Sequence, residues 1–303
     1  MARNIKKIIT FGDSFTAGDE LLQDTYMEDI LDILKSHSHI KVAKNGHAII
    51  SSEKERLTFH KDISELMLDK CGDRWTEYDR QFEFTYSNLL AKKLEVEVVN
   101  YAKGGNSNIG IYDNVVNCIE TIDSSTLLLI GSSFIGRRTR NNPQVGASNW
   151  TPKQQHLWHY KTHLPLSPRP GREAEHQKYI ELDIEFGDDC YFSYLAYTTQ
   201  LLALKSELTS KNIPHYFIDA TGTHTRASSS DRQNLVDDST KKQQEYIQKT
   251  LDSVFLPVSL LDSAASATRA GFKHDQLFGH FSREAHKQYA NYLFDIVTRA
   301  NIV

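Results

Sequence analysis

The chain has 303 residues, with 35 Lys and Arg against 39 Asp and Glu, which gives a formal net charge of −4. Hydrophobic residues make up 39% and charged residues 24%, which is typical of a globular protein and unlike a disordered chain. The slight acidic excess argues against a dedicated nucleic-acid-binding protein, because such proteins usually carry a basic excess. We therefore expect one folded domain over residues 1–303 and no nucleic-acid partner.

Cysteine usage and apolar runs indicate a compartment. Cys71, Cys118 and Cys190 are widely spaced and form no CxxC pair, so neither a zinc ribbon nor a thioredoxin-like site is expected. The apolar run near the N-terminus is shorter than the roughly 7–15 residues of a secretory signal. No stretch approaches the ~20 apolar residues of a membrane span. The sequence thus predicts a cytoplasmic protein without a membrane span.

Short apolar strands alternate with helical patterns along the chain. In chain order the predicted elements are a strand at Ile5–Phe11, a helix at Gln81–Leu94, a strand at Glu95–Tyr101, a helix at Ile109–Ile122, a strand at Thr126–Ile130, a helix at Tyr191–Leu208, a strand at His215–Ala220 and a helix at Ser282–Ala300 with Ser282 as its N-cap. This alternation predicts an α/β fold, with a parallel sheet covered by helices on both faces. Sites in such sheets lie beyond the carboxyl ends of the strands.

Residues 134–180 interrupt the pattern, and we expect an insertion after the third strand. The segment holds five of the seven prolines and two of the three tryptophans, so it differs in composition from its surroundings. Arg137, Arg138 and Trp158 are candidate substrate-binding residues, because guanidinium groups pair with anions and aromatic faces stack on sugars or acyl chains. A packed lid that only stabilises the domain is the alternative.

The same segment contains three histidines at helical spacing, His156, His159 and His163. One helical face could gather them around a metal ion. Trp and Tyr residues interleave with them, and no acidic residue is spaced to join them. This pattern favours packing over metal binding, so no metal site is expected.

A serine follows the first predicted strand, in the heptapeptide GDSFTAG at residues 12–18. A serine that begins a helix at a sheet edge presents its hydroxyl there, and the unpaired N–H groups of the helix start can stabilise an oxyanion. Ser14 is therefore a candidate nucleophile, and a plain N-cap role is the competing interpretation. A serine nucleophile needs a base. His280 is the candidate, because it lies in a loop directly before the last predicted helix.

These segments resemble the SGNH/GDSL hydrolase family, which has a GDS block, a second block with Gly, a third with Asn and a last with Asp and His. The first block matches as GDSFTAG, and the second matches as NYAKGGNS at residues 100–107. The order and spacing of the blocks agree over nearly the whole chain outside 134–180. The resemblance implies a flavodoxin-like, three-layer α/β/α fold.

The resemblance also implies a serine esterase. Ser14 would attack an acyl ester, such as an acetyl group on a carbohydrate or another small-molecule ester, with His280 as general base. The N–H groups of Ser14 and Gly105 would hold the oxyanion, and Asn106 is assigned to substrate binding. No metal or organic cofactor is implied.

The chain departs from the family pattern at two positions. Ser133 stands where the family has Asn, and we expect its hydroxyl to complete the oxyanion hole. Leu277 stands where the family has Asp, so Asp275 is the candidate for orienting His280, with a Ser–His dyad as the alternative. These departures leave open a slow enzyme or a non-catalytic protein that binds glycans or serves in an assembly. The chain also resembles SGNH-like proteins of bacteria and their viruses, which leaves a virion-associated role open.

Overall fold

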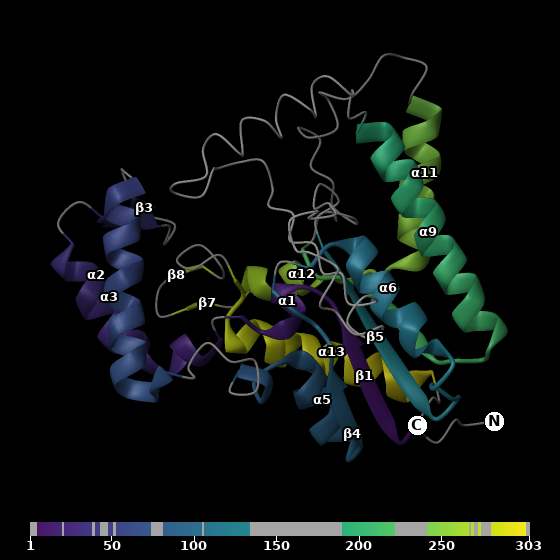
Figure 1. Cartoon of the computed structure of the whole chain (residues 1–303), viewed down its shortest axis with the longest axis horizontal. Coiled ribbons are helices and arrows are strands. Elements are labelled where there is room, and N and C mark those ends of the chain that lie inside the picture. The colour runs from purple at the N-terminus through teal and green to yellow at the C-terminus, as the bar shows by residue number, and fades with distance from the viewer. Residues whose placement is uncertain are drawn as a thin grey trace, which may run out of the picture.

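A four-stranded parallel sheet forms the centre of the computed structural model (Figure 1). Its strands are β1 (Lys7–Phe11), β4 (Glu97–Asn100), β5 (Thr126–Ser132) and β6 (His215–Asp219), in the order β4-β1-β5-β6. Every neighbouring pair runs parallel. All four strands predicted from the sequence are confirmed.

The structure describes residues 5–19, 21–37, 40–42, 48–50, 53–73, 81–104, 106–133, 190–221, 241–266, 268–269, 272–273 and 280–300.

Helices cover both faces of the sheet, which makes three layers (Figure 1). On one face lie α5 (Tyr86–Leu94), α12 (Leu260–Ser266) and α13 (Arg283–Arg299), and on the other lie α6 (Asn108–Ile119), α9 (Cys190–Ser210) and α11 (Lys241–Val254). The predicted helices correspond to α5, α6, α9 and α13, and Ser282 is the N-cap of α13, as expected. The α/β fold with helices on both faces is therefore confirmed.

Successive residues of the central strands point to opposite faces, as pleated strands require. In β5, Leu127 and Leu129 join the core under α5 and α13, whereas Leu128 and Ile130 join the core under α6 and α9. Because both faces are covered, every residue of β5 is buried. This explains the uninterrupted apolar run from Leu127 to Ile130 at the centre of the strand.

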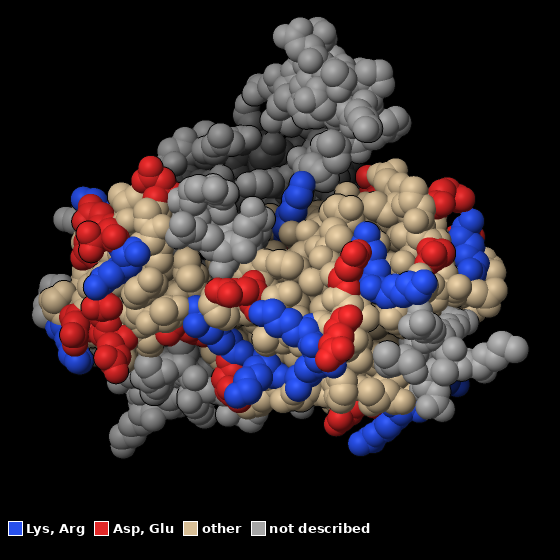
Figure 2. Space-filling view, turned by 90° about the horizontal axis from the view of Figure 1, so that it is seen from below, with Lys and Arg blue, Asp and Glu red and all other residues tan. Residues whose placement is uncertain are grey.

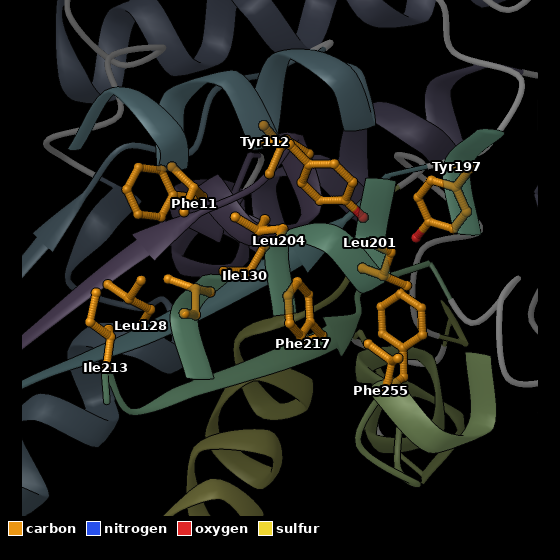
Figure 3. Close-up of a cluster of buried hydrophobic side chains, with 14 of the residues drawn as sticks. Phe11, Tyr112, Leu128, Ile130, Tyr197, Leu201, Leu204, Ile213, Phe217 and Phe255 are labelled. Atoms are coloured by element: carbon orange, nitrogen blue, oxygen red, sulfur yellow. The ribbon is translucent and has the colours of Figure 1, made fainter. Parts of the chain in front are cut away.

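The core under α6 and α9 includes two buried tyrosines, Tyr112 and Tyr197. The rings of Tyr112 and Tyr197 are stacked with their centroids 6.1 Å apart, and their hydroxyl groups point toward one another (Figure 3). Burial raises the pKa of both side chains. Both phenols therefore stay protonated in the neutral range.

A helical extension follows β1 in the chain and has a hydrophobic core of its own (Figure 1). It comprises the 3-10 helix η1 (Leu21–Tyr26), α2 (Met27–Ser36), the antiparallel pair β2 (Ile40–Val42) and β3 (Ala48–Ile50), and α3 (Glu53–Cys71). Its buried side chains are Met27, Ile30, Leu34, Phe59, Ile63 and Met67. A further two-stranded pair, β7 (Thr268–Arg269) and β8 (Phe272–Lys273), precedes α13.

The short helix α1 (Ser14–Ala17) packs directly on the ends of β1 and β5. A Cβ atom added to Gly12 would lie 2.4 Å from Thr16 Cβ, and one added to Gly131 would lie 2.1 Å from Thr16 Oγ1. Both distances are far shorter than van der Waals contact, so only glycine fits at either position. Gly18 ends α1 with φ +82°, a left-handed conformation that glycine adopts at little cost.

Lys and Arg lie among Asp and Glu on the face shown in Figure 2. Among the helices that the structure describes, none is both long and apolar enough to cross a membrane.

Replacing Gly131 by Ala tests the close packing of α1. We expect Gly131→Ala to lower the free energy of unfolding by about 1–3 kcal/mol, because the new methyl group meets the Thr16 hydroxyl. In a Thr16→Ala background the nearest remaining Thr16 atom would be Cβ at 3.2 Å, so the same change should cost less. Urea denaturation of the four proteins measures this difference. Equal costs in both backgrounds would show that Thr16 does not impose the glycine.

Candidate active site

The candidate site lies at the carboxyl edge of the sheet, between β1 and β5. Taken in chain order, the four strands of this sheet are arranged 2-1-3-4, so the connections run in opposite directions from β1. Open parallel sheets bind ligands in the crevice at such a switch point, outside the carboxyl ends of the two strands. Ser14 follows β1 and Ser133 follows β5, so both lie at this crevice.

Asp13, and not Ser14, is the N-cap of α1. The backbone of Asp13 is extended, and its Oδ1 accepts a hydrogen bond from the N–H of Phe15 at 3.1 Å. Ser14 is the first residue of the helix, where its own N–H has no acceptor within the helix. The interpretation of Ser14 as a plain N-cap is therefore wrong.

The Asp13 carboxylate also joins the two central strands. Ser133 Oγ donates to Asp13 Oδ2 at 2.7 Å, and neither residue has measurable solvent exposure. The negative charge also acts on Tyr86, whose pKa is raised by burial and further by the neighbouring Asp13. A buried carboxylate needs hydrogen-bond donors, and Asp13 receives them from α1 and from the end of β5.

This geometry changes the role expected for Ser133. We expected its hydroxyl to donate to an oxyanion, but its proton is directed at Asp13. A carboxylate is a stronger acceptor than a neutral ester carbonyl, so the hydroxyl stays with Asp13 in this arrangement. Ser133 holds the ends of the two strands together.

Asn108 is a site residue that sequence reasoning missed. It is the first residue of α6 and is buried. Its Oδ1 accepts from the N–H of Ser133 at 2.7 Å, and its Nδ2 donates to the carbonyl oxygen of Ser133 at 2.9 Å. This pair of bonds fixes the backbone directly after β5. The available signal was its position on the buried face of α6, because a buried amide there requires hydrogen-bond partners.

Asn106, the neighbouring candidate for substrate binding, lies at the start of the same helix. Its Oδ1 would lie 2.4 Å from a Cβ atom added to Gly110, so its side chain packs over the first turn of α6. Ser107 caps this helix by accepting from the N–H of Gly110 at 3.3 Å. Because Asn108 bonds to Ser133, this start of α6 lies close to the switch point.

His280 lies beside the segment that carries Ser14. Its ring centroid is 4.9 Å from that of Phe15, the residue after Ser14, and the ring of Phe281 is 5.1 Å from Phe15 on the same face of the sheet. Among the described contacts there is no direct hydrogen bond from the Ser14 hydroxyl to the His280 imidazole. Catalytic hydrogen bonds are often longer in unliganded enzymes and shorten when substrate binds.

The remaining predicted site residues lie outside the described part of the chain. These are Gly105, Asp275, Arg137, Arg138 and Trp158. Their roles stay predictions, as does the insertion at 134–180. Within the described residues, no group of three or more His, Cys, Asp and Glu side chains is placed to hold a metal ion.

The chain was compared with family models, curated proteins and solved structures. No family model and no curated protein matches the chain. A solved carbohydrate esterase, described as having an active site with divergent catalytic and non-catalytic binding functions, resembles it with a TM-score of 0.38 and 11% identity. The match covers 99% of this chain and 66% of that one, so the chain spans about two-thirds of its length. The fold rests on the observed sheet order and layers, since a likeness this weak carries no argument.

The contribution of the Asp13–Ser133 hydrogen bond to stability can be compared with that of a similar hydrogen bond on the surface. Ser125 Oγ donates to Asp123 Oδ1 at the same 2.7 Å, but in an exposed turn. We expect Ser133→Ala to lower the free energy of unfolding by about 1–3 kcal/mol, because a buried carboxylate oxygen loses its donor. Ser125→Ala should change it by less than about 0.5 kcal/mol, since water replaces the lost donor. Urea denaturation measures both values, and equal effects would remove the special role of Asp13.

Proposed function

We propose that this protein is a serine hydrolase that cleaves acyl esters. The observation that carries the proposal is that His280, near the C-terminal end of the chain, packs against Phe15, the residue that follows Ser14. Ser14 begins a helix directly after β1, and His280 lies against the next residue, Phe15. A serine beside an imidazole at the start of a helix supplies a nucleophile, a base and N–H donors in one place.

In the proposed reaction, Ser14 Oγ attacks the ester carbonyl and His280 takes the hydroxyl proton. The imidazolium then gives that proton to the departing alcohol, which leaves an acyl group on Ser14. Water, deprotonated by the same imidazole, hydrolyses the acyl-enzyme and restores the hydroxyl. Atoms and charges balance without a metal or an organic cofactor.

Two N–H groups are proposed to hold the oxyanion, those of Ser14 and Gly105. The first belongs to the start of α1, where helix-start donors and the helix dipole both favour a negative charge. Asp275 is proposed to orient the imidazole of His280, with a Ser–His dyad as the alternative. Ser133 contributes by holding Asp13, and through it the start of α1.

The proposed substrate is an acetyl or other small acyl ester, with a carbohydrate as one source of the alcohol. The resemblance of the GDSFTAG and NYAKGGNS segments to SGNH hydrolases supports this class. Arg137, Arg138, Trp158 and Asn106 are the proposed substrate contacts. Arginine pairs with anionic groups and tryptophan stacks on the face of a sugar, so these residues would bind the alcohol part of the ester.

A fluorophosphonate probe tests the nucleophile, because it reacts quickly only with an activated serine. We expect the wild-type protein to be labelled and to hydrolyse p-nitrophenyl acetate. Ser14→Ala should abolish labelling and reduce turnover about a thousandfold or more, since the attacking oxygen is lost. His280→Asn should slow both reactions strongly. Ser36→Ala, a change at an exposed serine of α2, is the matched control and should behave as wild type.

Circular dichroism checks that each variant keeps the α/β fold. Labelling of the folded Ser14→Ala protein at the wild-type rate would contradict the assignment of the nucleophile. A folded wild-type protein that neither reacts with the probe nor turns over esters would favour the non-catalytic alternative, a glycan-binding or assembly protein on the same fold.

A further inference from the structure

The segment that carries His280 is bound to the segment that carries Ser14 through Arg283. Arg283 is the first residue of α13, three positions after His280. Its contacts reach across the chain to η1, which follows α1 through the turn at Gly18. The two segments thus meet twice, at Phe15 with His280 and Phe281, and at η1 with Arg283.

The contacts between η1 and α13 are reciprocal. Asp24 Oδ2 accepts a hydrogen bond from the N–H of Arg283 at 2.7 Å, so η1 supplies a second cap to α13 beside Ser282. In return, Arg283 Nε donates to the carbonyl oxygen of Leu21 at 2.8 Å, and Nη2 donates to the hydroxyl of Thr25. Each element therefore satisfies polar groups at the end of the other.

The guanidinium group also stacks on an aromatic ring. Its central carbon lies 3.3 Å from the ring centroid of Phe84, which precedes α5. Burial lowers the pKa of Arg283, and the charge of Asp24 opposes that change. Arginine stays charged throughout the neutral range, so the ion is retained in this half-buried place. The planar guanidinium group can stack on a ring and donate hydrogen bonds in two directions at once, which a lysine ammonium cannot do.

We propose that Arg283 and Asp24 are positioning residues that hold His280 at the Ser14 hydroxyl. The proposal rests on the proposed function and extends it to two side chains outside the reacting groups. Only a few residues separate Ser14 from η1 and His280 from Arg283, so a shift of α13 against η1 moves the imidazole against the nucleophile. A displacement of about 1 Å can lower a rate about a hundredfold.

The test measures the rate of fluorophosphonate labelling in variants of Arg283 and Asp24. We expect Arg283→Met to lower the rate at least tenfold. Arg283→Lys keeps the positive charge but loses the planar guanidinium group, so it should retain only part of the wild-type rate. Asp24→Asn should also lower it, because a charged cap of α13 becomes neutral. Lys287→Met is the matched control on the same helix, since its partner Glu284 and Lys287 itself are exposed.

The separate effects on kcat and KM distinguish a positioning role from a general loss of structure. With p-nitrophenyl acetate, the Arg283 variants should lower kcat and leave KM nearly unchanged, and their far-ultraviolet circular dichroism should match wild type. Wild-type labelling rates in folded Arg283→Lys and Asp24→Asn proteins would overturn the proposal, even where Arg283→Met fails to fold.

A second readout does not depend on activity. In protein carrying ¹³C-labelled histidine, the His280 resonance is assigned by its loss in His280→Asn. We expect Arg283→Lys to shift this resonance and Lys287→Met to leave it in place. If the wild-type protein is inert but the resonance shifts as expected, the proposed function fails and the positioning stands. If the protein is active and neither resonance nor rate changes, the positioning fails alone.

Discussion

One buried hydrogen bond, from Ser133 Oγ to Asp13 Oδ2, joins the ends of the two central strands. The same carboxylate caps α1, so the helix that begins with Ser14 is fixed to both strands by one side chain. Asn108 fixes the Ser133 backbone from the other side. Thr16 packs against Gly12, directly after β1, and against Gly131 in β5, so α1 lies closer to the sheet than a side chain at either position would allow. The place of Ser14 follows from these contacts.

The last helix completes the site from the other end of the chain. Phe281 is buried in the core under α5 and α13, and Ser282 caps α13, so the residues after His280 have little freedom. Arg283 then ties the same helix to η1. If Ser14 and His280 act as proposed, the nucleophile is placed by the start of α1 and the base by the segment that leads into α13. Such preorganisation is what catalysis by positioning requires.

The elements of the central sheet could be predicted from the sequence because burial on both faces favours apolar and β-branched residues, as in Leu127–Ile130 of β5. A signal for α3 was also present, since Phe59, Ile63 and Met67 recur every four residues. The site was only partly predictable. Asp and Ser are equally good N-cap residues, so the sequence alone does not say which of Asp13 and Ser14 caps α1. In the structure, Asp13 is the N-cap and Ser14 is the first residue of the helix. The partner of Asn108 lies on another strand, which only the folded chain reveals.

We propose that Ser14 and His280 act as nucleophile and base. A crystal structure of the protein after reaction with a fluorophosphonate tests it most directly. We expect phosphorus bonded to Ser14 Oγ, the phosphoryl oxygen facing the N–H of Ser14, and an imidazole nitrogen of His280 within about 2.6–3.2 Å of Ser14 Oγ. An adduct on another residue, or a His280 ring turned away from an adduct on Ser14, would contradict it.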